Sequence, residues 1–223
     1  MKKILACLFF ICTVCTLLSC DPLTSEKNTK TNEVTSFINT SHLDYLTVPV
    51  TFAKGTKAAG IYIYAEAPGY HFVKDTDEGF TCVDDVARAA QVYLRNKNFS
   101  SDTATQAKAI NLIRFILEMQ SDNGYFYNFL FPPDRVNRAG ATSINNANWW
   151  SWRALYTLAE AAPLMKNIDA SLATKINAAT NKLVTKIKAD LVNIPATTKV
   201  VSGITVPQWL PAGSATDQAA III

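Results

Sequence analysis

The stretch that decides the fold is Glu78-Gly-Phe-Thr-Cys-Val-Asp-Asp-Val-Ala-Arg-Ala-Ala90, which opens the first long helical pattern of the chain. Thr81 stands three residues before Asp84, a spacing typical of a capping box at a helix start. The stretch therefore predicts a helix that begins near Val83 and carries Asp84 and Asp85 in its first turn.

Helical patterns also follow this stretch, and a strand-forming segment precedes it. Beyond the first helix, which runs to about Arg95, we expect helices over residues 103–120, 149–162, 170–192 and from about 214. The third helix is expected to stop before Pro163. Residues 48–52 and 60–65 favour strands around a turn-like segment at 54–57, which predicts a small N-terminal β-hairpin.

The connections between these helices alternate between short and long. Short connections make antiparallel neighbours of the first two helices and of the next two. The long connections then fall at one rim, which is the plan of an α/α toroid built from repeated helical hairpins. The predicted fold class is mainly α: a partial α/α toroid of antiparallel helical hairpins with a small β-hairpin before it.

Polar and aromatic side chains gather in the segments that form this rim. The candidates are His71, Glu78, Asp84, Asp85, Arg88, Tyr125, Tyr127, Asn128, Asp134, Trp149, Trp150 and Arg153. Aromatic faces beside carboxylates, amides and guanidinium groups suit a sugar, because rings pack on its C–H faces while polar groups bind its hydroxyls. The second long loop can equally serve hydrophobic packing.

The quoted stretch, with Tyr93-Leu94-Arg95, resembles the first barrel helix of bacterial six-hairpin glycosidase-like proteins. Ile63-Tyr64-Ala65-Glu66, Gly124-Tyr125-Phe126-Tyr127-Asn128-Phe129 and Trp149-Trp150-x-x-Arg153-Ala154-Leu155 fit the same family. The resemblance covers roughly residues 43–223. It implies part of an (α/α)6 barrel and a role in carbohydrate metabolism, but it assigns no catalytic pair.

The two adjacent aspartates allow more than one interpretation. Carboxylates in a first helical turn accept backbone N–H bonds and suit the helix dipole, so Asp84 and Asp85 can simply cap the helix. The same environment favours a base or nucleophile over a general acid. Adjacent helix residues point in different directions, so a glycosidase pair needs a second carboxylate. Asp134, Asp217, Glu78 or a residue beyond Ile223 can supply it.

The first twenty residues predict export. Lys2 and Lys3 precede an apolar run and the segment Leu17-Leu18-Ser19-Cys20, which resembles a lipobox. We expect a lipoprotein signal peptide at 1–19, a lipidated Cys20 heading a flexible tether at 20–42, and the barrel-like domain at 43–223. The expected location is the cell envelope, with the protein lipid-anchored and facing the periplasm or the cell exterior.

Charge and cysteine content narrow the classes of function. Without Lys2 and Lys3, the 21 basic residues become 19 against 18 acidic ones, which is too balanced to predict nucleic-acid binding. Two histidines and the one mature cysteine that carries no lipid, Cys82, give no metal-ligand spacing, and no cofactor is expected. Cys82 also leaves no partner for an internal disulfide.

The predicted function is a lipid-anchored glycoside hydrolase that acts on an oligo- or polysaccharide by carboxylate acid/base chemistry. Two alternatives stay open: a non-catalytic glycan-binding or scaffolding lipoprotein, and a uronic-acid lyase or epimerase. The sequence ends on the apolar run Ala219-Ala220-Ile221-Ile222-Ile223, and we expect the chain to be a fragment of a longer protein. The sugar, the linkage, the stereochemical outcome and the membrane leaflet are not predicted.

Overall fold

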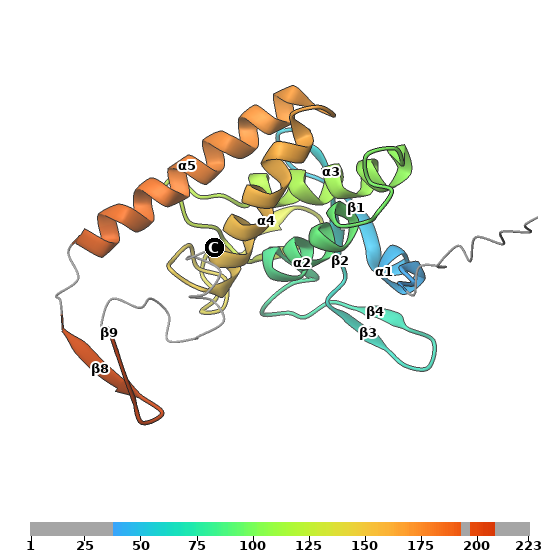
Figure 1. Ribbon diagram of the computed structural model, residues 1–223. Coiled ribbons are helices and arrows are strands. Elements are labelled where there is room, and N and C mark those ends of the chain that lie inside the picture. The colour runs from blue at the N-terminus through green and yellow to red at the C-terminus, as the bar shows by residue number, and fades with distance from the viewer. Residues whose placement is uncertain (1–37, 193–196, 208–223) are drawn as a thin grey trace, which may run out of the picture. The chain divides into compact units, whose positions relative to one another are not determined.

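The computed structural model describes residues 38–192 and 197–207, and Figure 1 shows the arrangement of their helices and strands. The described residues from position 39 onward belong to one compact unit. The helices of the described residues are α1 Ser41–Leu46, α2 Val83–Leu94, α3 Thr103–Glu118, α4 Trp149–Met165 and α5 Ala170–Val192. The predicted signal peptide, Cys20, most of the predicted tether, Asp217 and the helix expected near Ser214 lie outside the described residues.

Short antiparallel strands accompany these helices. They are β1 Thr47–Thr51, β2 Lys57–Ile61, β3 Tyr64–Glu66, β4 His71–Val73, β5 Thr81–Cys82, β6 Phe129–Phe131, β7 Arg135–Val136, β8 Thr198–Val201 and β9 Ile204–Pro207. The class is therefore mixed, and the predicted mainly α description is too simple. Apolar loop residues such as Phe129 and Leu130 are buried, and their backbone groups need hydrogen-bond partners that neighbouring segments supply as strands.

The first four predicted helices are present close to their expected bounds, but the expected end of the third is wrong. Helix α4 continues through Pro163 to Met165. A proline lacks one backbone donor and clashes with the preceding turn, which is most disruptive in a helix interior. Pro163 stands only two residues before the end of α4, so little helix follows the interruption.

The predicted capping residue of α2 is also wrong. The N-cap is Cys82, whose sulfur accepts a hydrogen bond from the backbone N–H of Asp85 at 3.4 Å. Thr81 is fully buried, and its hydroxyl accepts instead from the backbone N–H of Ile61 in β2 at 2.9 Å. This hydrogen bond to β2 thus occupies the hydroxyl group that a capping box at α2 would need.

Helix α2 lies at the centre of the packing. It contacts both α3 and α4, and α4 contacts α5. The β1–β2 hairpin covers α3 through β2. The core contains large side chains with no exposed surface, among them Trp150, Trp152 and Phe115. Since buried apolar area supplies most of the stability of a domain, this interior fixes where the first turn of α2 stands.

A three-stranded sheet joins the start of α2 to the long segment between α3 and α4. Cys82 of β5 pairs with Phe129 of β6, and Leu130 pairs with Val136 of β7. The backbone N–H of Val83 donates to the carbonyl oxygen of Asn128 at 2.8 Å. The sheet therefore brings Asn128, from far along the sequence, against the first turn of α2.

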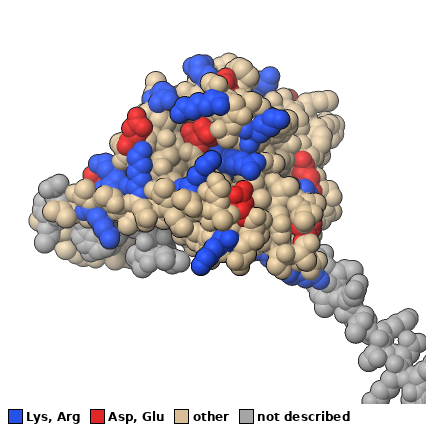
Figure 2. All heavy atoms as spheres, turned by 90° about the horizontal axis from the view of Figure 1, so that it is seen from above, with Lys and Arg blue, Asp and Glu red and all other residues tan. Residues whose placement is uncertain are grey.

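Helix α5 has one side that faces solvent. Lys175, Lys182 and Lys188 of α5 are exposed, while Leu183 and Ile187 of the same helix are buried. Figure 2 shows Lys and Arg side chains spread over the face that it views, with acidic side chains between them. Among the helices described, none combines the length and apolar character needed to cross a bilayer.

Candidate functional site

The first turn of α2 lies at a pocket of about 250 Å³ that several candidate residues share. Its lining includes Tyr64, Glu78, Cys82, Asp84, Asp85, Asn128, Phe129, Thr142 and Trp149. Three carboxyl groups therefore share one pocket with an amide and three aromatic rings. The strand β3, the β5–β6 pair and the start of α4 each contribute part of the wall.

Asp84 is the most strongly held of the three carboxylates. One of its oxygens contacts Arg153 of α4, and the same oxygen lies 3.3 Å from Nε of Arg88. Its backbone N–H donates to the side-chain oxygen of Asn128 at 3.2 Å. Its side chain is largely buried, so it binds the start of α2 to α4 as well as facing the pocket.

Asp85 belongs to a second group of contacts, with Cys82 and Arg88. The thiol of Cys82 donates to the carboxylate of Asp85 at 3.3 Å, and Arg88 contacts the other carboxylate oxygen. Burial, followed by the negative charge of Asp85, holds the pKa of the Cys82 thiol well above its usual value. Cys82 is therefore a capping group and not a nucleophile, because the thiolate is the reactive form.

Glu78 has a different environment from the two aspartates. Its carboxylate accepts hydrogen bonds from the hydroxyl groups of Tyr64 at 3.1 Å and of Thr142 at 2.9 Å. Neither partner carries a positive charge, and no ion pair to Glu78 occurs among the described residues. The hydrogen bond to Glu78, together with desolvation, raises the pKa of the Tyr64 hydroxyl, so Tyr64 remains a donor at neutral pH.

Asn128 and Trp149 complete the wall opposite these carboxylates. The Asn128 amide donates to the carbonyl oxygen of Thr142 at 3.1 Å, which fixes its orientation. Trp149 is partly exposed, and its ring packs edge-on against Trp150 with the centroids 5.0 Å apart. A fixed amide, carboxylates and a partly exposed ring are the groups that bind sugar hydroxyls and C–H faces.

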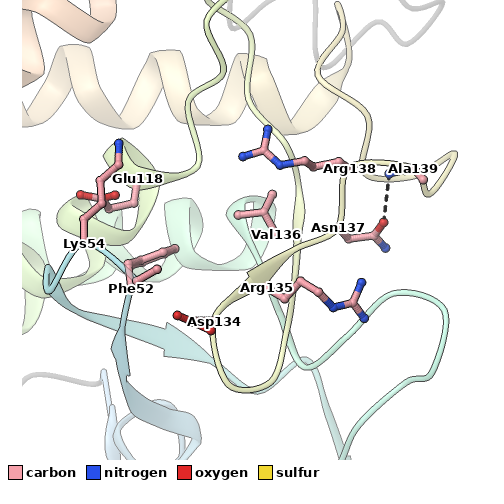
Figure 3. Close-up of a pocket in the computed structure, with 10 residues that line it drawn as sticks. Phe52, Lys54, Glu118, Asp134, Arg135, Val136, Asn137, Arg138 and Ala139 are labelled. Atoms are coloured by element: carbon pink, nitrogen blue, oxygen red, sulfur yellow. Dashed lines mark hydrogen bonds between the residues drawn. The ribbon is translucent and has the colours of Figure 1, made fainter.

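Asp134 is not brought to this pocket. It lies between β6 and β7 and lines a separate, larger pocket of about 530 Å³. Figure 3 shows Asp134 there with Phe52, while Lys54 and Glu118 approach from one side and Arg138 from the other. The structure therefore places this candidate carboxylate away from the group formed by Glu78, Asp84 and Asp85.

Two aromatic candidates have packing roles. Trp150 has no exposed surface, and its indole N–H donates to the carbonyl oxygen of Phe126 at 2.8 Å. Tyr125 is buried, and its hydroxyl donates to Asp190 of α5 at 2.6 Å. Because both polar groups are satisfied inside the protein, neither side chain is presented to a ligand.

The remaining candidates are His71, Arg88 and Tyr127, and Tyr127 packs partly buried against the core. His71 is exposed on β4, opposite Glu66 of β3, and does not line the pocket. The guanidinium group of Arg138 lies over the ring of Tyr127, 4.8 Å from its centroid. Arg88 is exposed beside the two aspartates. Of these, Arg88 alone contacts the carboxylates of the pocket.

Tyr64 and Thr142 are pocket residues that the sequence did not identify. Tyr64 stands in one of the segments that resemble the glycosidase-like family, so its position carried a signal. Thr142 carried none, because only the fold of the segment from Asn137 to Ser143 brings it to Glu78. That segment is fixed by hydrogen bonds that the Ser143 hydroxyl makes with the carbonyl oxygen of Asn137 and the N–H of Phe129.

No cluster of three or more His, Cys, Asp or Glu side chains in the described part of the chain is arranged to hold a metal ion. A comparison of the chain with protein-family models and a comparison with curated proteins both find no match. The chemistry of the pocket must therefore be argued from its own residues.

Proposed function

We propose that the chain is the N-terminal part of an exported, lipid-anchored glycoside hydrolase whose active centre includes the pocket of Glu78, Asp84 and Asp85. The observation that carries this proposal is the contrast between carboxyl groups in one pocket. Asp84 and Asp85 contact guanidinium groups, whereas the partners of the Glu78 carboxylate in the described part of the chain are hydroxyl groups. Glycoside hydrolysis requires one carboxyl group that donates a proton and another that stays ionised.

The roles follow from these partners. Glu78 is the general acid that protonates the leaving oxygen, because its described partners are hydroxyl groups, which can accept a hydrogen bond from a carboxylic acid as well as donate one to a carboxylate. Asp84, held by Arg153 and Arg88, is the ionised group that activates water or attacks the sugar. Asp85 aligns Arg88 and binds a substrate hydroxyl. Trp149 and Asn128 bind the sugar itself.

The packing of the helices supports the toroid that this proposal includes. Two antiparallel hairpins, α2 with α3 and α4 with α5, meet through α2 and α4. In an α/α toroid the first helices of successive hairpins meet in the same way and line the inner ring. The barrel closes with helices that the described residues do not contain.

Hydrolysis by site variants tests the proposal. The full-length protein is incubated with a panel of glycans, and released reducing sugar is measured for Glu78→Gln, Asp84→Asn and Asp85→Asn. We expect turnover to fall by roughly a hundredfold or more in Glu78→Gln and Asp84→Asn. Asp77→Asn is the matched control, since Asp77 neighbours Glu78 without lining the pocket, and it should retain full activity.

Two outcomes point to other functions. Normal turnover in both Glu78→Gln and Asp84→Asn excludes these residues as the catalytic pair. Retardation of the protein in gels that contain a glycan, without any product, favours the non-catalytic glycan-binding alternative. Product that absorbs as an unsaturated uronic acid indicates a lyase, for which the hydrogen bond between Tyr64 and Glu78 offers a proton path.

A further inference from the structure

Aromatic rings group at the surface that α1 and the β3–β4 hairpin form. We call the side chains of His42, Tyr45, Tyr62, Tyr70 and Phe72 the aromatic platform. In Figure 1 the β3–β4 hairpin extends from the helices on the side where α1 lies, and these two elements carry most of the rings. Tyr45 is 50% exposed, Tyr70 48% and Phe72 38%. Large aromatic side chains grouped in this way at a surface mark an interaction site.

The rings contact one another in series. Tyr62 stacks on Phe72 with centroids 4.2 Å apart and planes inclined by 11°. The centroid of Phe72 lies 5.0 Å from that of Tyr45, and His42 lies 4.8 Å from Tyr70. Since each ring limits the movement of the next, the surface is ordered before any ligand arrives.

The backbone of the hairpin is held in a conformation that exposes Tyr70. Its φ is 52°, in the left-handed region that non-glycine residues rarely occupy. The hydroxyl of Tyr45 donates to the carbonyl oxygen of Tyr70 at 3.1 Å, which links α1 to the hairpin at this point. Strained residues of this kind persist where the surroundings fix them, and they concentrate at functional sites.

The aromatic platform and the candidate active pocket share the β3–β4 hairpin. Tyr64 of β3 lines the pocket and contacts Glu78. Phe72 of β4 pairs with Ala65, so its ring lies on the face of the hairpin opposite to that of Tyr64, because successive side chains of a strand point to opposite faces. The pocket and the platform are therefore separate sites on two faces of one hairpin.

The segment from Tyr62 to Glu78 carries an excess of negative charge, which disfavours binding of an anionic partner. Between Tyr62 and Glu78 there are four acidic residues and one basic residue: Glu66, Asp75, Asp77, Glu78 and Lys74. An anionic bilayer surface attracts basic segments, so this one is poorly suited to it. Exposed rings among acidic and hydroxyl groups are better suited to the C–H faces of neutral sugars.

From these observations we infer that the aromatic platform is a binding site for neutral sugar rings of the oligo- or polysaccharide chain on which the proposed enzyme acts. The inference rests on the proposed function and extends it, because it makes the substrate a polymer with few charges. Stacking on the platform positions that chain and takes no part in the chemistry.

Affinity electrophoresis tests the platform separately from catalysis. The full chain, carrying Cys20→Ser so that no lipid contributes, is run in gels that contain xylan, mixed-linkage β-glucan, galactomannan or de-esterified pectin. We expect retardation in at least one neutral gel, and a dissociation constant about tenfold weaker in Phe72→Ala and Tyr45→Ala. Phe72→Tyr keeps the ring and should keep the retardation. Leu164→Ala is the control of matched exposure, at 37%, and should change nothing.

Three results in these gels overturn the inference. They are equal retardation of Phe72→Ala and the unsubstituted chain, retardation in pectin only, and no retardation in any gel. Cosedimentation with vesicles of phosphatidylethanolamine and phosphatidylglycerol that depends on Tyr45 and Phe72 overturns it in favour of a bilayer.

Catalysis and platform binding can fail independently. Glu78→Gln should lose hydrolysis yet keep its retardation, because Glu78 lies outside the platform. If Glu78→Gln stays active while Phe72→Ala loses retardation, the proposed catalytic role fails and the platform stands. If Glu78→Gln is inactive and Phe72→Ala binds normally, the platform fails and the catalytic proposal stands.

Discussion

At the scale of single residues, Gly79 holds Glu78 in the pocket. Its φ is +113°, and a Cβ added there would lie 2.3 Å from the carbonyl oxygen of Leu130 in β6. Since that oxygen is backbone held in the sheet, it cannot move aside. We predict that Gly79→Ala lowers the free energy of unfolding by more than about 2 kcal/mol, through strain added to overlap. Urea denaturation measures the change.

Gly55 provides the matched control for this substitution. Its φ is +84°, and a Cβ there meets nothing within 4 Å. Gly55→Ala therefore introduces the unfavourable backbone conformation without the overlap, and should lower stability by only about 1 kcal/mol. Equal losses in the two variants would show that Leu130 does not restrict position 79.

At the scale of elements, the start of α2 depends on the unusual cap Cys82. Serine is among the preferred N-cap residues, and its oxygen can accept the N–H of Asp85 in place of sulfur. We predict that Cys82→Ser stays within about 1 kcal/mol of the unsubstituted chain, whereas Cys82→Ala loses about 1 kcal/mol more. Thermal unfolding of the two variants tests this. If the alanine variant were more stable than the serine variant, burial of an apolar side chain, and not capping, would determine which residue is most stabilising at position 82.

The helices were predictable because their signals are local. Helix α5 follows from an apolar stripe, and α2 from the pattern that begins at Val83. The cap of α2 was not predictable, because the Thr81 hydroxyl accepts a hydrogen bond from the backbone N–H of Ile61, twenty residues away, and is therefore not available to α2. Strands β6 and β7 were missed for the same reason, since short strands are defined by their partners and not by their own sequence.

The candidate site was partly predictable on the same grounds. Asp84, Asp85 and Glu78 lie close in sequence around one helix start, so their proximity in the pocket could be expected. The position of Asp134 depends on the sheet β5–β6–β7, which local sequence does not predict. This sheet places Asp134 at a different pocket. Trp150 and Tyr125 are buried because the packing of α4 and α5 encloses them, which a single sequence pattern does not reveal.

At the scale of the whole molecule, a hydrogen-bonded group connects α5 to the segment that follows α3. Tyr125 donates to Asp190, Lys186 contacts the same carboxylate, and Gln120 donates to the carbonyl oxygen of Ala179 at 2.9 Å. Burial alone would raise the pKa of Asp190, but the hydrogen bonds from Lys186 and Tyr125 together lower it.

This connection predicts a pH-dependent effect of Tyr125→Phe. A carboxyl group whose pKa is lower in the folded state than in the unfolded state stabilises the protein at pH values above its unfolded-state pKa. That contribution is lost as the pH falls through its folded-state pKa. Tyr125→Phe should therefore lose about 1 kcal/mol or less at pH 7, as solvent screens a partly exposed carboxylate. At pH 3 the difference from the unsubstituted chain should shrink. Urea unfolding at both pH values measures it, with Tyr127→Phe as control. A difference that grows toward pH 3 contradicts the assignment.

The proposed lipid anchoring at Cys20 gives the last prediction. The segment Leu17-Leu18-Ser19-Cys20 has a small residue before a cysteine, as lipid attachment requires, whereas Cys15 lies within the apolar run. Cys20→Ser should abolish labelling with radioactive palmitate and release the protein from the membrane fraction of a producing bacterium. Cys15→Ser removes another thiol of the same region and should leave both properties intact. Equal labelling of the two variants would refute lipidation at Cys20. The glycan-binding and hydrolysis assays would then still apply to the unanchored chain, because none of the pocket residues lies near that position in the sequence.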